Sequence, residues 1–559
     1  MTDTTTGAEC FVQTLEEYGV TRVFGNPGTT ELPVLKAIAD ADLEYTLALH
    51  EDIAVGMAAG YASTRRYHAT ERPPLGVVNL HITPGMAHGL GNLYGAHWAG
   101  APLLITAGNH ELDFRHEEPL LDGDLEAMVE QFTKFSAEVT DIEALPLLCR
   151  RAVRAALTPP TGPAFLALPM DIMLEAAEIS PEPLGAIPTA GGGDPTQLQA
   201  ATDALISATD PVLVVGDHVA RNDGVDGAVT LAEAAGTRVH GEILACEVNF
   251  PADHDQWLSH IPPQEGPASM LLDADTIVFA GCSSNTTLLR HENDLVGADT
   301  TTIHISDAPG DLGKRIPADV SLLGDPGQIC TELAERVADR LEATTHTARL
   351  ERTSTLKDSL AGLVESMGVD ETPPDETRPN KAALVDALYD LAPDAFIVDE
   401  GVTSKYPLLT RWPLKPQQLL SNKGGGLGYG LPAALGAAFA QDERDDPQSV
   451  IGYVGDGSYL YYPHSLYSAV RYDLDLTIIV PDNRNYRILK DNTNAIFGGD
   501  DDDHSFVGMD FDPPVDLVAN AESHGASAHQ VTTPDELDPI LSSALSNDGP
   551  DVVDVLVHD

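Results

Sequence analysis

The chain has 559 residues, 43% of them hydrophobic, and it carries 87 acidic against 31 basic side chains. This length exceeds what one hydrophobic core usually serves, and it predicts three or four domains. The formal net charge of −56 repels nucleic acid and anionic membrane surfaces, so we expect neither as a partner.

The acidic residues are spread along the chain, and only a short DDDD run at 500–503 concentrates them. This dispersed pattern, rather than an acidic tail, predicts a strongly hydrated halophilic surface, as in proteins from a high-salt cytoplasm where salt screens self-repulsion. No apolar run reaches the length of a membrane span, and the start MTDTTTGAE lacks the features of a signal peptide. Five scattered cysteines without CxxC spacing predict reduced thiols. We therefore expect a cytoplasmic protein without disulfides.

Short apolar strands alternate with helical patterns in three blocks, which we place at 1–182, 195–342 and 380–559. The Gly-rich run AGGGDPTQ separates the first two blocks, and a polar stretch at 343–379 separates the last two. This alternation predicts an α/β protein with three doubly wound parallel-sheet domains. The first and third blocks could share one architecture.

The first block places polar side chains at the ends of apolar strands. The segment VFGNPGTTELP indicates a strand, a tight turn and a helix that Thr29 or Thr30 can cap. Glu51 follows an apolar strand and begins an Ala/Gly-rich helix, and His81 ends another strand before a Gly-rich turn. A carboxylate at such a strand end is costly unless it is paired, although a helix dipole can also stabilise it. Alone, each residue admits a purely structural role.

The third block contains a βαβ unit with two polar ends. SVIGYV is followed by a GDGS turn, roughly four turns of helix, and the strand LTIIVP, which ends in DNRN. Parallel strands bring both carboxyl ends to one sheet edge, so Asp456 and Asn483 should be neighbours. Their side-chain oxygens, with a backbone carbonyl near Asn485, suit Mg²⁺ that also binds phosphate oxygens. Gly457 and Ser458 open the helix, where free N–H groups favour an anion. The unit therefore predicts a Mg-diphosphate site.

GDG followed by an asparagine-rich turn resembles the thiamin diphosphate signature. FGNPGTTELP, ALHEDIAVGMAAGYA, NLHITPG and KGGGLGYGLPAALGAAFA extend the likeness over nearly the whole chain. In this order and spacing the motifs resemble the thiamin diphosphate-dependent 2-oxo acid decarboxylases of the benzoylformate decarboxylase type. The resemblance implies pyrimidine-binding, central and diphosphate-binding domains in that order, with thiamin diphosphate and Mg²⁺ as cofactors.

The resemblance also implies roles for single residues of the first block. Glu51 is the acid that contacts the pyrimidine ring of the cofactor and promotes its activation. His81 transfers protons to and from reaction intermediates, and Thr29 offers a hydroxyl to the substrate carboxylate. In the central block, His291 is the nearest candidate for a second active-site histidine.

In the third block, the resemblance assigns the metal to Asp456, Asn483 and the carbonyl of Asn485. The remaining cofactor contacts fall on Gly457 and Ser458 at the diphosphate, on Thr403 beside it, on a carbonyl near Gly425, and on Leu427, which wedges under the bent cofactor. The alternative to cofactor contact for the GGGLG run is a purely structural role, in which the glycines allow a helix to pack closely on a strand.

After Asn485 the chain departs from the family. Bulky Ile488 and polar Asn492 should shrink or rearrange the aryl pocket that the family forms there. Arg484, Arg487 and Lys490 form a basic cluster, which is either a solvated helix face paired with nearby acids or a guide for an anionic substrate.

The expected function is the thiamin diphosphate- and Mg-dependent, non-oxidative decarboxylation of a benzoylformate-like 2-oxo acid to an aldehyde and CO₂. The alternative is an acetolactate synthase-type carboligase, against which His81 argues because those synthases lack this histidine. A binding protein without turnover is disfavoured by the intact Glu51, Asp456 and Asn483. The resemblance further implies a homodimer or homotetramer with active sites at the subunit interface.

Overall fold

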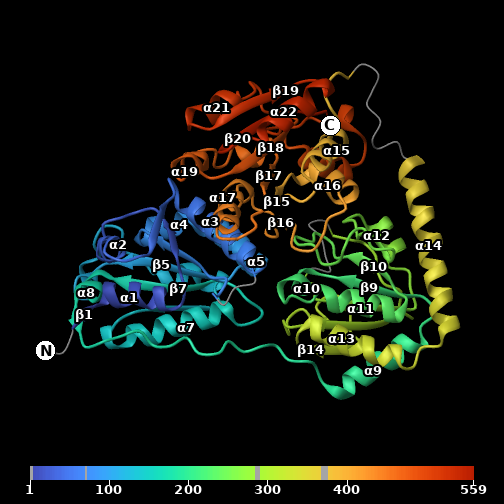
Figure 1. The fold of residues 1–559 in the computed structure, drawn as a ribbon, viewed down its shortest axis with the longest axis horizontal. Coiled ribbons are helices and arrows are strands. Elements are labelled where there is room, and N and C mark those ends of the chain that lie inside the picture. The colour runs from blue at the N-terminus through green and yellow to red at the C-terminus, as the bar shows by residue number, and fades with distance from the viewer. Residues whose placement is uncertain (1–3, 69–71, 284–289, 367–375, 559) are drawn as a thin grey trace. The chain divides into compact units, whose positions relative to one another are not determined.

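The computed structural model describes residues 4–68, 72–283, 290–366 and 376–558. Within these ranges the strands form three parallel sheets of six strands each and one antiparallel pair, β1 (Thr5–Thr6) with β8 (Ala176–Ala177). Helices separate the successive strands of the first and last sheets along the chain, and in the central sheet they separate β9 from β10 and β11 from β12 (Figure 1). This arrangement confirms the predicted α/β class with three parallel-sheet domains.

The first sheet has the strand order β3-β2-β4-β5-β7-β6. One hydrophobic core covers one of its faces with α1 and α7, and a second core covers the other face with α3 and α5. The strands are β2 (Arg22–Gly25), β3 (Glu44–Leu47), β4 (Gly76–Leu80), β5 (Leu103–Asn109), β6 (Phe135–Glu138) and β7 (Ala164–Pro169). The helices are α1 (Gly7–Glu17), α2 (Leu32–Ala39), α3 (Glu51–Arg65), α4 (Ile82–His88), α5 (Leu90–Ala99), α6 (Leu125–Val129), α7 (Leu145–Leu157) and α8 (Met170–Leu174).

The last sheet repeats this connectivity as β16-β15-β17-β18-β20-β19. In both sheets the strands, counted along the chain, are arranged 2-1-3-4-6-5, so the first and third blocks do share one architecture. The strands are β15 (Phe396–Glu400), β16 (Leu419–Ser421), β17 (Val450–Val454), β18 (Leu476–Asp482), β19 (Ser527–Val531) and β20 (Pro550–Leu556). The helices are α15 (Lys381–Leu391), α16 (Lys405–Arg411), α17 (Gly430–Asp442), α18 (Asp456–Tyr459), α19 (Ser465–Arg471), α20 (Arg487–Phe497), α21 (Leu517–Ser523) and α22 (Leu537–Ala544).

The central sheet has a different order, β11-β10-β9-β12-β13-β14, which reads 3-2-1-4-5-6 along the chain. This is the order of doubly wound dinucleotide-binding folds. Its strands are β9 (Pro211–Val215), β10 (Arg238–Gly241), β11 (Trp257–His260), β12 (Thr276–Ala280), β13 (Thr301–Ser306) and β14 (Val320–Leu323). The helices are α9 (Pro195–Ser207), α10 (Asp217–Arg221), α11 (Val225–Ala235), α12 (Glu265–Leu271), α13 (Pro326–Ala338) and α14 (Ala343–Ser366).

The first and last sheets belong to one compact unit, and the central sheet forms another. The first unit comprises Met1–Ile187, Pro374–Leu408 and Leu420–Asp559; the second comprises Pro188–Pro373 and Leu409–Leu419. In the first unit, α3 packs directly on α17 within one shared core. A Cβ at Gly60 would lie 2.1 Å from the Ala433 carbonyl oxygen, and one at Gly436 only 1.9 Å from that of Met57. Glycine is therefore required where these helices cross. The predicted domain bounds stay predictions.

Three local expectations were wrong. The helix expected after GDGS is interrupted between α18 and α19, where Pro463 has no N–H to donate to a helix. The polar stretch 343–379 is no simple connection, because it contains α14; Arg349 anchors this helix by donating to the carbonyls of Leu205, Ala208 and Ala235. Neither Thr29 nor Thr30 caps α2, which begins without a side-chain cap.

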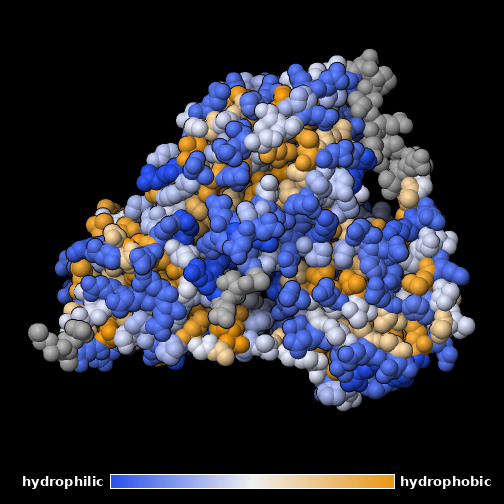
Figure 2. Space-filling model, viewed as in Figure 1, coloured by the Kyte–Doolittle hydropathy of each residue, from blue (hydrophilic) through white to orange (hydrophobic). Residues whose placement is uncertain are grey.

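Hydrophilic residues cover most of the surface that Figure 2 presents, as expected for a chain with 87 acidic side chains. In the part of the chain that the structure describes, no helix is both long and apolar enough to cross a membrane. All five cysteines are buried, and none of them forms a disulfide in the structure.

Candidate active site

The carboxyl edge of the first sheet brings a buried glutamate against His81. This part of the edge lies at the neighbouring strands β2 and β4. The chain leaves these two strands toward opposite sides of the sheet, and open α/β sheets bind ligands at such a point. Glu31 follows β2, and its fully buried side chain accepts a hydrogen bond from His81 Nδ1 at 2.9 Å. A Cβ at Gly28 would lie 1.9 Å from His81 Nδ1. Only glycine at position 28 permits this pair.

Four hydrogen bonds fix the Glu31 carboxylate. Besides His81, its second oxygen, Oε1, accepts from the Thr30 hydroxyl at 2.7 Å, the Gly108 N–H at 2.8 Å and the Ile82 N–H at 3.1 Å. A carboxylate with this many partners holds the imidazole in one orientation. Glu31 was not among the predicted site residues, because in the sequence it stands at the expected start of a helix. Its position just after β2, beside the strand that carries His81, was the available signal.

Glu51 lies close to His81. A Cβ at Gly85 would be 2.9 Å from Glu51 Oε1 and 3.0 Å from His81 Cβ, so both side chains flank this one glycine. Glu51 Oε2 also lies 3.3 Å from Nδ1 of the exposed His88. Preceding Glu51, His50 caps α3 because its Nδ1 accepts the Asp52 N–H at 3.1 Å. Burial, together with the neighbouring His88, lowers the pKa of His50 although Glu51 opposes the shift.

The start of α3 is hydrogen-bonded to the last domain. Asp52 accepts the Asn92 N–H at 2.6 Å through one oxygen and the Tyr462 hydroxyl at 2.8 Å through the other. Asn92 in turn donates to the Gly428 carbonyl at 3.4 Å. Burial raises the pKa of Asp52 to about 6 despite these hydrogen bonds. Thr29, at the same edge of the first sheet, is exposed.

The last sheet gathers carboxylates at its carboxyl edge. Asp456 begins α18 after β17, and Asp482 ends the neighbouring strand β18. Asp456 is 5% exposed, and its Oδ2 is buried without a hydrogen-bond partner among the described residues. Burial, followed by the charge of Asp482, raises the pKa of Asp456 to about 8. An unsatisfied buried carboxylate oxygen leaves a place for a cation.

The DNRN turn completes this donor set. The Asn485 amide donates to the Asn483 carbonyl at 2.8 Å, which makes a compact turn with Arg484 in the left-handed region at φ +60°. Tyr486 covers the GDG turn so closely that a Cβ at Gly457 would lie 2.6 Å from its ring. Carboxylate, amide and carbonyl oxygens are the ligands that Mg²⁺ prefers, so the residues present fit that metal.

The other predicted cofactor contacts lie on two nearby loops. Leu427 is half-buried in the loop that precedes α17, where Gly425 has φ +72° and Gly428 has φ +99°. Both glycines hold backbone conformations that other residues rarely adopt. Thr403 is half-buried in a short 3₁₀ turn, Val402–Ser404, that follows β15.

The basic cluster at the start of α20 is neutralised by acids. Arg487 makes ion pairs of 2.7 Å with Asp491 and 2.6 Å with Asp501, and Lys490 pairs with Asp510 at 2.6 Å. Arg484 Nε lies 3.9 Å from Asp482. These pairs favour the solvated, ion-paired helix face over a guide for anionic substrates. Ile488 and Asn492 are both half-buried.

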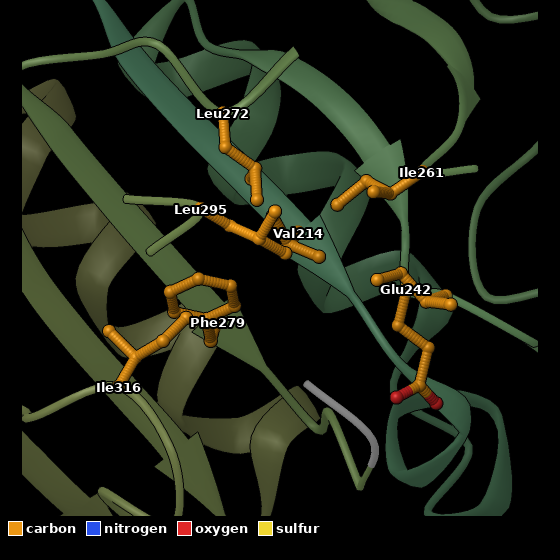
Figure 3. Close-up of a pocket in the computed structure, with 8 residues that line it drawn as sticks. Val214, Glu242, Ile261, Leu272, Phe279, Leu295 and Ile316 are labelled. Atoms are coloured by element: carbon orange, nitrogen blue, oxygen red, sulfur yellow. The ribbon is translucent and has the colours of Figure 1, made fainter. Parts of the chain in front are cut away.

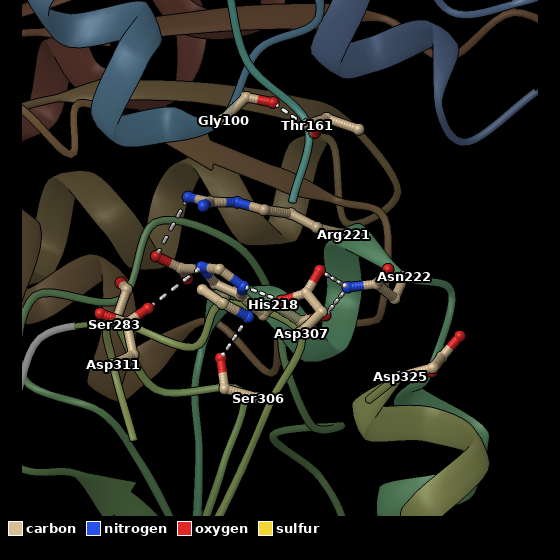
Figure 4. A network of polar contacts seen from close by, with 12 residues as sticks. Gly100, Thr161, His218, Arg221, Asn222, Ser283, Ser306, Asp307, Asp311 and Asp325 are labelled. Atoms are coloured by element: carbon tan, nitrogen blue, oxygen red, sulfur yellow. Dashed lines mark hydrogen bonds and ion pairs between the residues drawn. The ribbon is translucent and has the colours of Figure 1, made fainter. Parts of the chain in front are cut away.

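Polar side chains contact one another at the carboxyl edge of the central sheet (Figure 4). His218 pairs with Asp307, which also accepts from Asn222 at 3.1 Å, and Arg221 donates to Glu247 at 3.1 Å. Although burial opposes the shift, the hydrogen bond from His218 holds the pKa of Asp307 below its usual value.

Glu242, at the same edge, accepts the N–H groups of Asp217 and Ser283 at 3.0 and 3.1 Å, and it borders an apolar cavity of about 10 Å³ (Figure 3). That volume holds at most one water. His291 belongs to this unit, and its Nε2 contacts the Pro263 carbonyl at 2.8 Å.

Comparison with known proteins gives one consistent result. Three family models match in order: "Thiamine pyrophosphate enzyme, N-terminal TPP binding domain" at residues 5–133, the central domain at 198–333, and the C-terminal TPP binding domain at 403–555. Benzoylformate decarboxylase of Pseudomonas aeruginosa is 31% identical over 548 residues, covering 97% of both chains. Acetolactate synthase of Bacillus subtilis is 26% identical and covers 99% of this chain and 93% of its own.

Among solved structures, the thiamine diphosphate-dependent 4-hydroxybenzoylformate decarboxylase of Rhodococcus jostii RHA1 superimposes with a TM-score of 0.84 at 26% identity, covering 99% of each chain. Benzoylformate decarboxylase from Polynucleobacter necessarius gives a TM-score of 0.85 at 25% identity, covering 99% of this chain and 98% of its own.

The chain belongs to the thiamin diphosphate-dependent enzymes. Within that family it is similar over its full length to a benzoylformate decarboxylase, and it carries the N-terminal, central and C-terminal domains that the family models describe.

Proposed function

We propose that this enzyme catalyses the Mg²⁺-dependent, non-oxidative decarboxylation of a 2-oxo acid to an aldehyde and CO₂. The observation that carries the proposal is the His81–Glu31 pair beside Glu51, because it sets an oriented proton-transfer group next to a carboxylate. The similarity to benzoylformate decarboxylases supports the same reaction.

Each group of the first sheet's edge has a task in this reaction. Bound thiamin diphosphate supplies a thiazolium ring that accepts the electron pair left by CO₂. The carboxylate of Glu51 would hydrogen-bond the pyrimidine ring and hold a proton there. His81 moves protons at Nε2, because Nδ1 is engaged by Glu31. Thr29 offers its hydroxyl to the substrate carboxylate.

The cofactor's diphosphate end belongs to the last sheet. Asp456, Asn483 and the Asn485 carbonyl would hold Mg²⁺, and the buried, unpartnered Oδ2 of Asp456 supports this. The remaining contacts are proposed for Gly457, Ser458 and Thr403, which would hold the diphosphate, for the Gly425 carbonyl, which would accept from the pyrimidine amino group, and for Leu427, which would pack against the cofactor.

We further propose a homodimer or homotetramer in a high-salt cytoplasm, with each active site at a subunit interface. The net charge of −56 supports the high-salt setting, since dense charge of one sign needs screening. His291 is proposed as the second active-site histidine, supplied by the central domain.

The substrate is proposed to be a benzoylformate-like 2-oxo acid, and the alternative function is carboligation of the acetolactate synthase type. The similarity to an acetolactate synthase over 99% of this chain supports this alternative. His81 and its Glu31 partner favour decarboxylation, because release of an aldehyde requires a protonation that this pair can deliver.

Purified protein incubated with thiamin diphosphate, Mg²⁺ and a panel of 2-oxo acids in concentrated KCl tests the proposal. We expect equimolar CO₂ and aldehyde, with a large loss in His81→Ala and no loss in the control His116→Ala, an exposed histidine. Acetolactate formed from pyruvate without free aldehyde would establish the carboligase instead. CO₂ release that is unaffected by His81→Ala would refute the role of His81.

A further inference from the structure

Glu400 stands at the point of the last sheet where a ligand crevice is expected. It ends β15, which neighbours β17 in parallel register, with Glu400 opposite Val454. The connections from these two strands lead to opposite sides of the sheet, and open α/β sheets bind ligands in the crevice at such a point. Yet Glu400 is only 3% exposed, so it faces the protein interior there.

The side chain of Glu400 holds the loop that precedes α17. Its oxygens accept the N–H groups of Gly430 at 2.7 Å, Gly428 at 3.3 Å and Tyr429 at 3.4 Å. They also accept the side-chain amide of Asn422 at 2.7 Å. A carboxylate at a helix N-terminus satisfies N–H groups that the helix itself leaves without acceptors.

Asn422 extends this contact across the glycine loop. Its amide donates to the Gly426 carbonyl at 2.5 Å, and its oxygen accepts the Gly425 N–H at 3.0 Å. Both ends of the GGGLG loop are thus tied to one buried carboxylate, directly at Gly428 and through Asn422 at Gly425. The loop needs such ties because its glycines make the free backbone unusually mobile.

The backbone of Glu400 reaches the other half of the cofactor site. Its carbonyl accepts the N–H of Gly455, the residue before Asp456, at 3.2 Å. A Cβ at Gly430 would lie 2.7 Å from Glu400 Cβ, so there is no room for a side chain at position 430. One residue therefore joins the metal-side turn to the loop that carries Leu427.

We infer that Glu400 is a positioning residue that, with Asn422, sets the glycine loop in its cofactor-binding conformation before thiamin diphosphate arrives. The inference rests on the proposed function, which places the cofactor against this loop. Preorganisation of a binding loop raises affinity by removing the ordering cost from the binding step. Loss of Glu400 should therefore weaken cofactor binding more than it alters folding.

Glu400→Gln and Asn422→Ala test this against the control Glu247→Gln, a buried glutamate of the central domain that pairs with Arg221. We expect both test variants to raise the Kd for thiamin diphosphate, measured by fluorescence in Mg²⁺, about tenfold or more, as for lost hydrogen bonds to a charged group. Backbone amides of the peptide 422–430 should exchange hydrogen faster in the apoprotein. The control should change neither quantity.

Wild-type Kd and wild-type exchange in Glu400→Gln would overturn the inference. Faster exchange spread evenly over the last domain would do the same, since it would indicate general loosening. Should Glu400→Gln fail to fold, Asn422→Ala carries the test, because Asn422 is only half-buried. A wild-type protein that binds no thiamin diphosphate would refute the proposed function, while amide exchange would still decide whether Glu400 fixes the loop.

Discussion

The first and last sheets share one strand order, and each places a buried glutamate at its ligand-binding edge, but the two glutamates serve different partners. Glu31 orients an ionisable side chain, His81, and Glu400 fixes backbone N–H groups at the start of α17. In our proposals, the carboxyl end of the first strand thus serves proton transfer in one domain and cofactor placement in the other. The comparison teaches that shared architecture predicts where a site lies and leaves its chemistry to local residues.

The largest effect should come from Glu51, on the proton-transfer side of the comparison. Glu51→Gln should lower kcat about 10²- to 10⁴-fold, the usual range for loss of a general acid–base group. Steady-state CO₂ release at saturating cofactor measures this, with the exposed Glu117→Gln as control. A loss of kcat below threefold would show that the first sheet does not provide the proton-transfer group, and the contrast between the two sheets would not hold.

Because Glu400 is buried, we expect its ionisation to make the free energy of unfolding depend on pH. Burial raises the pKa of Glu400 from its ordinary 4.5 to about 7 despite its hydrogen bonds. The folded state therefore holds this proton more tightly than the unfolded state, and stability falls as pH rises from about 4.5 to about 7. Glu400→Gln should remove about 3 kcal/mol of that fall.

Denaturant unfolding of the apoprotein at pH 5 and pH 8, in constant KCl, measures this difference. Parallel losses in wild type and variant would show that Glu400 ionises normally.

Glu31 should have a smaller effect on catalysis than Glu51, because it acts through His81. Glu31→Gln keeps the size of the side chain and removes its charge, and kcat should fall by roughly 10- to 30-fold, the cost of weakening one charge-assisted hydrogen bond. In a His81→Ala background the same change should have almost no effect. Additive losses in the double variant would show that Glu31 supports the fold and not the histidine.

The smallest effect is expected at Arg487, whose ion pairs with Asp491 and Asp501 occupy it. Exposed pairs contribute about 0–1 kcal/mol, so Arg487→Gln should change KM for any 2-oxo acid less than about twofold. KM measured for monocarboxylic and dicarboxylic substrates checks this. A rise in KM for dicarboxylic substrates alone would show that the basic cluster does guide anionic substrates.

The sequence predicted what short motifs and strand periodicity encode. The GDG and DNRN motifs were predicted at the carboxyl ends of neighbouring parallel strands, and in the structure they follow β17 and β18, because parallel βαβ units allow little else. Pro463 was readable as a helix break and was overlooked. The long helix α14 escaped prediction because its polar residues give no clear apolar stripe, and its anchor, Arg349, binds distant carbonyls.

Contacts between distant segments were beyond the sequence. Glu31 and His81 are 50 positions apart, and Glu400 lies 30 positions before Gly430, with no periodic signal linking either pair. The neighbourhood of Glu51 and His81 came from resemblance alone. The structure supplies the physical basis at Gly85: because this residue has no side chain, the side chains of Glu51 and His81 can both lie against it.

The glycine crossing of α3 and α17 has a consequence for biosynthesis. α3 ends at Arg65 and α17 begins at Gly430, so its partner is translated 365 residues later. At about 5–20 residues per second, the apolar surface of α3 waits roughly 20–70 s on the ribosome before it can be covered. We expect the nascent first domain to need a chaperone during that interval, while the central domain folds by itself in between.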